Sequence, residues 1–559
     1  MPLFLFFLVL CVASSLSAQS DSARLENTLT AYLTFDQLST GLPWRLDTEQ
    51  STPGQIAALT SFREALPDRD RLSDRQRIDR DLLAYVLDDR MYRLRFGHHL
   101  LPLDAEGGFL AEIIYRFSGR RVATEADYRK YLNDLRTLPD YLRGQEANLR
   151  RGLAQGKVHP RRVVELNLAL IDRQLASPVG EGLFADPPER ADWKQTAVTI
   201  TRDTIYPAYA HLRRFLAEEY LPALPEEIGI AAITDGRDFY RQRIRYFTSD
   251  SLATPESVFA TGEREVARIR AEMDTVIART GFTGSFSDFL LHLRTAAQFY
   301  AASPQDLLDR ASWITNRIQT AAPRYFSTLP RMPLVVAPVP AALAPNYTGG
   351  RYSQGSYDTR RAGQFWVNTY DLPSRPLYTL PALALHEGVP GHHTQIMLAA
   401  ELEGLSDFRR DLYLSAFGEG WGLYAEYLGQ EMGVYETDYD EFGRLTYEMW
   451  RACRLVVDPG MHYFGWSRER AVAYMAEHTA LSLREVNSEV DRYIGWPGQA
   501  VSYKMGELKI RALRKEAEAA LGARFDLAAF HAVVLGSGAV TMSLLAEHVR
   551  RYVAAELVD

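Results

Sequence analysis

The helical spacing of apolar residues between Ser22 and Phe326 is the feature that most restricts what this chain can fold into. Several helix starts carry a capping residue followed by proline, which is favoured at the first helical position, as at Thr254 and Ser303. Apolar residues after Thr254 recur three or four positions apart, as one face of a helix requires, at Val266, Ile269, Met273 and Ile277. These patterns predict a mainly α-helical fold.

Three of the twelve histidines lie close together in the stretch 385–395, which reads LHEGVPGHHTQ. Neutral imidazole is a ligand that suits zinc, and a carboxylate that adjoins a metal-binding His can act as a general base. His386 and His392 are six positions apart, so on a straight helix they would point in different directions. Because proline interrupts helical hydrogen bonding, we expect Pro390-Gly391 to break the helix and return His392 to the side of His386.

A third metal ligand is predicted from the stretch 418–426, GEGWGLYAE. Glu419 follows His392 at a distance that allows one helix to end and a second helix to return. Two His and one Glu on facing helices make a three-ligand zinc site with an open position for water. His393 is the alternative to His392, and a buried polar cluster without metal is the alternative to the whole site.

Further polar residues are candidates for supporting roles. Glu426 is placed to hydrogen-bond the ring nitrogen of a metal-binding His that does not face the metal. His462 is an alternative ligand, although Pro459-Gly460 is expected to break the helix before it. Tyr503 is the first choice and His531 the second as donor to an oxyanion that develops during metal-dependent hydrolysis. Either residue could equally satisfy a buried helix end.

The sequence changes character near Arg331, where short β-favouring runs replace the helical spacing. They predict a small antiparallel β element next to the metal helix. Its edge, at Gln364 to Asn368, either binds an extended peptide as an added strand or only caps the helical core. We expect an N-terminal helical lobe at 19–330 and a metal-binding catalytic lobe at 331–559, or one continuous domain over 19–559.

Residues 1–18 resemble a secretory signal peptide, with an apolar core at 3–13 and small residues before a cleavage point after Ala18. This predicts an exported protein, either periplasmic or extracellular. Lipoprotein processing at Cys11 is disfavoured because Leu10 is bulkier than that processing prefers. No later stretch is apolar and long enough to cross a membrane as a helix.

Cleavage would leave Cys453 as the single cysteine, so stability has to come from the core and not from disulfides. The net charge of −8 is modest, and the Arg-rich stretch 69–80 alternates with Asp. That alternation indicates a solvated surface and not a nucleic-acid site. The oligomeric state stays open.

The two metal motifs together resemble a bacterial family, the domain-of-unknown-function family 885. Three later stretches are similar as well: Arg454–His462, Pro497–Tyr503 and Phe530-His531. That family looks like a distant branch of the gluzincin metallopeptidases, the largely helical group that includes angiotensin-converting enzyme. Dipeptidyl peptidase III is similar in carrying an insertion between its two motif His. The resemblance implies a large two-lobed, metallopeptidase-like zinc fold and leaves the substrate open.

We therefore expect a zinc hydrolase with one Zn²⁺ per chain, held by His386, His392 and Glu419, and with Glu387 as general base. The expected substrate is a short peptide, on the strength of the family resemblance alone. One alternative is a zinc hydrolase of a different amide or of an ester. The other is a peptide- or glycan-binding protein without catalysis.

Overall fold

The computed structural model describes residues 20–558, except 41–43, 45, 119, 186–189, 342–343, 345–346 and 411. The predicted signal peptide, residues 1–18, lies outside these described residues. The chain forms two compact units, which we call unit 1 and unit 2. Unit 1 comprises Met1–Phe239 and Asp491–Pro497, and unit 2 comprises Tyr240–Val490 and Gly498–Asp559.

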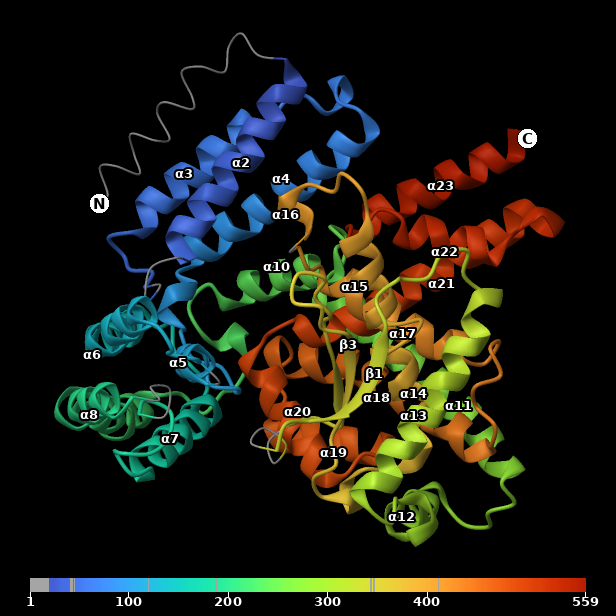
Figure 1. Cartoon of the computed structure of the whole chain (residues 1–559). Helices are drawn as coiled ribbons and strands as arrows, with labels where there is room; N and C mark the ends of the chain where they lie inside the picture. Colours follow the sequence, from blue (N-terminus) through green and yellow to red (C-terminus); the bar gives the residue numbers. More distant parts are fainter. Residues whose placement is uncertain are drawn as a thin grey trace. The chain divides into compact units, whose positions relative to one another are not determined.

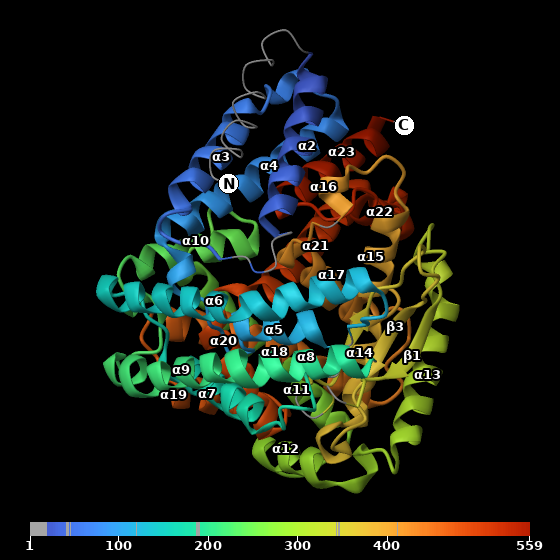
Figure 2. The same cartoon turned by 60° about the vertical axis from the view of Figure 1, so that its left-hand side comes forward.

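The elements of unit 1 that carry labels are all helices (Figures 1 and 2). Its helices are α2 (Asp21–Thr40), α3 (Thr52–Ala65), α4 (Asp74–Phe96), α5 (Phe109–Phe117), α6 (Glu125–Gln155), α7 (Arg161–Ala176), α8 (Ala191–Ile200) and α9 (Tyr206–Phe215). The longest, α6, begins at a capping box in which Thr124 and Asp127 each bond the other's backbone N–H. Its buried face packs against α8 and α9 (Figure 2).

Unit 2 contains most of the other helices and the three strands. The helices are α11 (Pro255–Arg279), α12 (Phe286–Thr295), α13 (Pro304–Ala321), α14 (Leu380–Glu387), α15 (His392–Glu401), α16 (Asp407–Arg410), α17 (Ser415–Leu428), α18 (Asp438–His462), α19 (Arg468–His478), α21 (Ser502–Leu521), α22 (Leu527–Leu535) and α23 (Met542–Val558). The boundary between the units falls within α10 (Gly236–Thr248) and α20 (Leu483–Gly495). The mainly α fold is thus confirmed.

The predicted boundary between residues 330 and 331 differs from the observed division at 239 and 240. The reason is that α11, although separated from α18 by more than 150 residues, packs tightly against it in unit 2. A Cβ at Gly262 of α11 would lie 2.7 Å from the Leu455 side chain, so the two helices are in close contact. Arg268 of α11 also forms an ion pair with Glu448 of α18. The start of the β-favouring runs marks a change of element type and not a domain boundary.

The sheet has the strand order β1-β3-β2, with β1 (Leu334–Pro338), β2 (Gly350–Ser353) and β3 (Gly363–Val367). It lies beside α13 and α14 in Figure 1, and β2 packs on α14, as predicted for a β element next to the metal helix. β2 pairs with β3 antiparallel as expected, whereas β1 pairs with β3 in parallel. The prediction that Gln364 to Asn368 forms a free edge is wrong, because β3 is the central strand and is paired on both sides.

α18 is continuous from Asp438 to His462 and contains Pro459. The predicted helix break at Pro459-Gly460 is therefore wrong. The whole segment from Phe442 to His462 is buried, and packing against neighbouring elements offsets the hydrogen bond that proline removes. None of the helices in the described part of the chain combines the length and apolar character needed to cross a membrane.

Candidate metal centre

The predicted break between the two motif histidines is present. α14 ends at Glu387 and α15 begins at His392, and the intervening turn brings the His386 and His392 rings to a centroid separation of 4.7 Å. A Cβ at Gly391 would lie 2.0 Å from the His386 carbonyl oxygen, so this tight turn requires glycine. The Trp421 indole N–H donates to the Pro390 carbonyl at 2.8 Å and fixes the turn against α17.

Glu419 of α17 joins the two histidines. Its Oε2 atom lies 3.6 Å from His386 Nε2 and 3.5 Å from His392 Nε2. The three ligand atoms all lie within 4.8 Å of one another, and among the described residues these three form the group able to hold a metal ion. The donor set, two imidazoles and a carboxylate, is one that zinc accepts with a position left open. The residues present therefore fit the metal.

Glycines in the stretch 418–422 allow this approach of α17. A Cβ at Gly422 would lie 2.7 Å from the His386 ring, and a Cβ at Gly420 would lie 2.6 Å from the Gly506 backbone of α21. A Cβ at Gly418 would lie 2.6 Å from the Tyr413 ring. The GEGWG pattern is thus a consequence of close packing around Glu419.

The ring nitrogen of His386 that faces away from His392 and Glu419 is hydrogen-bonded to a carboxylate, as expected for a metal-binding imidazole. Its Nδ1 atom lies 2.8 Å from Glu426 Oε1, which confirms that Glu426 is a partner of this His. Arg451 of α18 lies 3.4 Å from the same carboxylate oxygen. With Nδ1 occupied in this way, Nε2 is the nitrogen that faces His392 and Glu419.

The structure adds two partners that the sequence analysis does not predict. The Tyr413 hydroxyl donates to Glu419 Oε1 at 2.6 Å and so leaves Oε2 to face the histidines. The Gln395 amide lies 2.8 Å from His392 Nδ1 and 3.2 Å from the Gly418 carbonyl. Tyr413 precedes α17 in a non-helical segment, so helical spacing gave no signal for it. Gln395 lies three positions after His392, one helical turn away, and that spacing could have indicated it.

The electrostatics of His386 and Glu419 favour a positive charge between these two side chains. Burial lowers the pKa of His386, but bonds to Glu419 and Glu426 outweigh this and raise it to about 9. Burial raises the pKa of Glu419, but hydrogen bonds from His386 and His392 outweigh it and hold that pKa well below its usual range. The carboxylates of Glu419 and Glu426 thus stabilise positive charge at the His386 ring, and a bound divalent metal would take the place of the proton that they favour.

Glu387, the expected general base, is buried at the end of α14. Its Oε2 atom accepts a hydrogen bond of 2.8 Å from the Tyr352 backbone N–H on β2. One carboxylate oxygen is therefore fixed by the sheet. This contact gives β2 a role in orienting the carboxylate next to His386.

Tyr503 lies near the centre and His531 lies elsewhere. The Tyr503 ring is nearly parallel to the His386 ring, with centroids 6.4 Å apart, and the Arg454 guanidinium lies 4.3 Å from the Tyr503 centroid. His531 on α22 has both ring nitrogens occupied, by the Tyr424 hydroxyl and the Tyr325 carbonyl, each at 2.8 Å. These contacts favour the alternative role of His531, a buried structural residue, over its role as the second choice for oxyanion donor.

The other candidate ligands also point away from the three. His393 bonds the Tyr352 hydroxyl and the Met332 carbonyl, each at 3.0 Å, so its nitrogens are engaged with the sheet side of α15. The His462 ring lies beside the Tyr240 ring, with centroids 5.4 Å apart. Neither belongs to the group of three.

Two solved structures similar to this chain are described as candidate lipoproteins. A protein described as a candidate lipoprotein from Colwellia psychrerythraea is 26% identical, with a TM-score of 0.81 and coverage of 91% of both chains. A second, described as a candidate lipoprotein of unknown function from Shewanella oneidensis, is 18% identical. Its TM-score is 0.73 over 94% of this chain and 99% of that chain, which shows a shared fold.

No curated protein matches the sequence. A family model described as "Bacterial protein of unknown function (DUF885)" matches residues 45–549, which is nearly the whole described chain. The chain belongs to this bacterial family of proteins of unknown function.

Proposed function

We propose that this protein is a zinc-dependent hydrolase, and most specifically a peptidase that cleaves short peptides. The observation that carries the proposal is the convergence of His386, His392 and Glu419, whose ligand atoms lie within 4.8 Å of one another. The carboxylate of Glu387 directly follows the first ligand in sequence. Buried charge-bearing groups that converge in this way are typical of functional sites.

Zinc, when bound, would supply Lewis-acid chemistry that activates water and polarises a carbonyl. Glu387 would take the proton from the attacking water and deliver it to the leaving amine. The Tyr352 backbone N–H holds the carboxylate of Glu387 in place for this transfer. Tyr503 would donate a hydrogen bond to the oxyanion that develops on the substrate.

The peptide substrate and the kinship with gluzincin peptidases are parts of the proposal that rest on resemblance. A zinc hydrolase of another amide or of an ester would use the same ligands and would differ only in its substrate pocket. A panel of short peptides, aryl amides and esters separates these substrates. We expect peptides to be hydrolysed fastest by the zinc-loaded protein, and activity to disappear with chelation and return with added zinc.

Two outcomes of that experiment contradict the proposal. Full hydrolytic activity after removal of all transition metal would exclude zinc chemistry at this centre. A zinc-loaded protein that hydrolyses nothing in the panel would favour a binding protein without catalysis.

Export also belongs to the proposal. The relative from Colwellia psychrerythraea is described as a candidate lipoprotein, which supports export of this chain. It also favours attachment of a lipid at Cys11, although the bulky Leu10 before that residue disfavours lipoprotein processing. Cys11 is the residue available for acylation in the leader. Intact-mass spectrometry of protein from membranes distinguishes a lipidated chain that begins at Cys11 from a free chain that begins at Gln19.

A further inference from the structure

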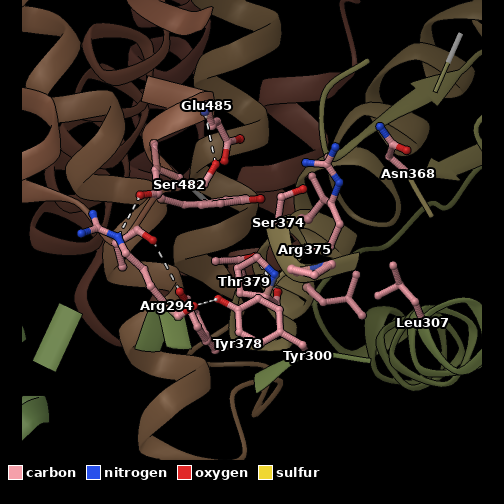
Figure 3. Close-up of a pocket in the computed structure, with 18 of the residues that line it drawn as sticks. Arg294, Tyr300, Leu307, Asn368, Ser374, Arg375, Tyr378, Thr379, Ser482 and Glu485 are labelled. Atoms are coloured by element: carbon pink, nitrogen blue, oxygen red, sulfur yellow. Dashed lines mark hydrogen bonds between the residues drawn. The ribbon is translucent and has the colours of Figure 1, made fainter. Parts of the chain in front are cut away.

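Unit 2 contains a cavity of about 300 Å³ that is separate from the three metal-binding side chains. It is bounded by the start of α14, by α18, by the start of α20 and by the segment before α14 (Figure 3). The side chains on which the inference depends are Arg294, Tyr300, Arg375, Tyr378, Tyr447 and Glu485. The lining combines two guanidinium groups and one carboxyl group with aromatic and leucine side chains.

Arg375 makes no direct ion pair with the described residues, although the charges of Glu485 and Asp371 attract it from a distance. Its guanidinium forms no hydrogen bond and no ion pair with any residue in the described part of the chain, and its Nε atom is buried. Burial lowers the pKa of Arg375, which reflects the cost of holding this charge away from water. A half-buried guanidinium that lines a cavity and has no carboxylate within ion-pair distance is suited to an anionic ligand, because a bidentate carboxylate matches its geometry.

Glu485 is the complementary group on the opposite wall. Its backbone N–H donates to Ser482 Oγ at 3.2 Å, which fixes the first turn of α20 (Figure 3). Its carboxyl group forms no ion pair with the described residues, and burial together with the charge of Glu489 raises its pKa to about 7. The charges of Arg375, Arg451 and Arg454 all attract this carboxyl group without forming an ion pair with it. A ligand with a positive group beside Glu485 and a negative group beside Arg375 would satisfy both.

The rest of the lining is already engaged and forms a shaped wall. Arg294 donates to the carbonyls of Leu481 and Thr479, at 3.2 and 2.8 Å, so it positions the segment that leads into α20. Tyr300 and Tyr378 have their hydroxyls directed to backbone carbonyls, which leaves their rings as apolar surface. This surface would accommodate an uncharged side chain.

The cavity and the metal centre share two helices. On α14, Leu383 lines the cavity, and Glu387 lies four positions later on the same face. On α18, Tyr447 lines the cavity, and Arg451, which contacts Glu426, lies four positions later. Leu383 and Tyr447 therefore lie about one helical turn, roughly 6 Å along each helix, from Glu387 and Arg451.

We propose that this cavity binds a small zwitterion, a free α-amino acid, with its carboxylate on Arg375 and its ammonium group on Glu485. The volume is at the lower end of the range for small-molecule sites, which favours a single amino acid over a longer peptide. The site is distinct from the zinc ligands, so it goes beyond the proposed hydrolysis. A free amino acid is also a product of complete peptide hydrolysis, and its binding one turn from Glu387 would couple product level to activity.

Isothermal titration calorimetry of the full chain tests the site with defined probes. The probes are L-leucine and L-phenylalanine, each with one analogue that lacks the carboxylate and one that lacks the amine: 3-methylbutylamine, 4-methylpentanoate, 2-phenylethylamine and 3-phenylpropanoate. We expect at least one amino acid to bind, and both of its analogues to bind at least ~10-fold more weakly. Failure of both amino acids to bind at millimolar concentration, or equal affinity for the analogues, would overturn the proposal.

Variants assign the two charged contacts. Arg375→Gln should weaken binding of the amino acid at least ~10-fold, while the analogue that lacks the carboxylate binds as before. Glu485→Gln should also weaken binding of the amino acid at least ~10-fold, while the analogue that lacks the amine binds as before. Arg484→Gln is the matched control, because Arg484 is 61% exposed and lies 3.7 Å from Asp371. Thermal melting establishes that each variant is folded. Unchanged amino-acid affinity in a folded Arg375→Gln protein would exclude this site.

Titrations of chelated protein separate this inference from the proposed function. Amino-acid binding should persist without zinc, because no metal ligand lines the cavity. Loss of binding in Arg375→Gln with retained zinc content would support the site whatever the reaction is. Zinc-dependent hydrolysis without amino-acid binding would contradict the site and leave the hydrolase proposal standing.

Discussion

At the residue scale, the two glutamates near the histidines have different environments and should have different roles. Glu419 Oε2 faces both imidazoles, whereas Glu387 bonds the backbone of β2 and is absent from the group of three. The first arrangement suits a ligand that is shared with the histidines. The second suits a base that must remain free of the metal in order to accept a proton.

Substitution of the two glutamates tests this division. Glu387→Gln keeps the shape of the side chain but cannot accept a proton, so it should retain zinc and hydrolyse peptides at least ~100-fold more slowly. Glu419→Gln should lose both zinc and activity, because it removes an anionic ligand. Elemental analysis and steady-state kinetics of both proteins provide the measurement. Near-normal turnover by zinc-loaded Glu387→Gln would place the general base elsewhere.

Residue identities at the centre could be predicted from spacing only where helices supply them. His386, His392, Glu419 and Glu426 follow from helix length, a proline break and a returning helix. Tyr413 could not be predicted, because it reaches Glu419 from a non-helical segment whose path depends on tertiary packing. The two roles considered for His531 cannot be separated from sequence, because a buried imidazole with two protein partners and a catalytic imidazole are the same residue type in the same local pattern.

At the scale of elements, the approach of α17 to α14 depends on the absence of a side chain at Gly422. The Cβ of Gly422→Ala would lie 2.7 Å from the buried His386 ring, which is bonded to Glu426 and cannot retreat freely. We expect this variant to lose zinc and to cost about 1–3 kcal/mol of stability. Zinc content and urea unfolding are the measurements.

Gly54→Ala is the matched control for this substitution. Gly54 is also helical, in α3, but nothing lies within 4 Å of its added Cβ. This change should leave zinc unaffected and leave stability unchanged or slightly increased, because alanine favours helix. Full zinc content in Gly422→Ala would show that the helices can separate without disturbing His386.

The elements themselves were predictable to different degrees. Local signals such as the cap at Thr254 correctly gave α11, because they depend on neighbouring residues. The order of the strands was not predictable, since β3 is third in sequence but central in space. The continuity of α18 through Pro459 likewise depends on burial, which local sequence does not report.

At the scale of the whole molecule, buried neutral imidazoles make stability depend on pH. Burial lowers the pKa of His159 to about 3, and of His393 and His531 to about 4, from an ordinary value of 6.5. Below pH 6.5 the unfolded chain takes up protons that the folded chain does not. The free energy of unfolding should therefore fall as pH falls from 6.5 towards 4.

His159 provides a test with a single substitution in unit 1. Its Nε2 atom accepts a hydrogen bond from the Leu103 backbone N–H, which a glutamine oxygen can also accept. His159→Gln should reduce the slope of unfolding free energy against pH by up to ~1.4 kcal/mol per pH unit between about pH 4 and 6. Urea unfolding at several pH values measures the slopes. Identical slopes in both proteins would show that His159 is not a source of the acid sensitivity.

The division of the chain into units was the least predictable feature at this scale. A change from helical to β-favouring sequence near Arg331 is a local property, whereas α11 belongs with α18 because of contacts across the sequence. The mainly α fold class could be predicted, because it depends only on whether each element is a helix or a strand.

The central claim is that one zinc ion binds between His386, His392 and Glu419. Anomalous scattering from a crystal, measured above and below the zinc absorption edge, tests this most directly because it locates the metal and identifies it. We predict one peak per chain at zinc-bonding distance, about 2.0–2.2 Å, from ligand atoms of these three residues, with His393 uninvolved. A fully active protein whose crystals show no zinc peak there, or a peak coordinated by His393 in place of His392, would contradict the account.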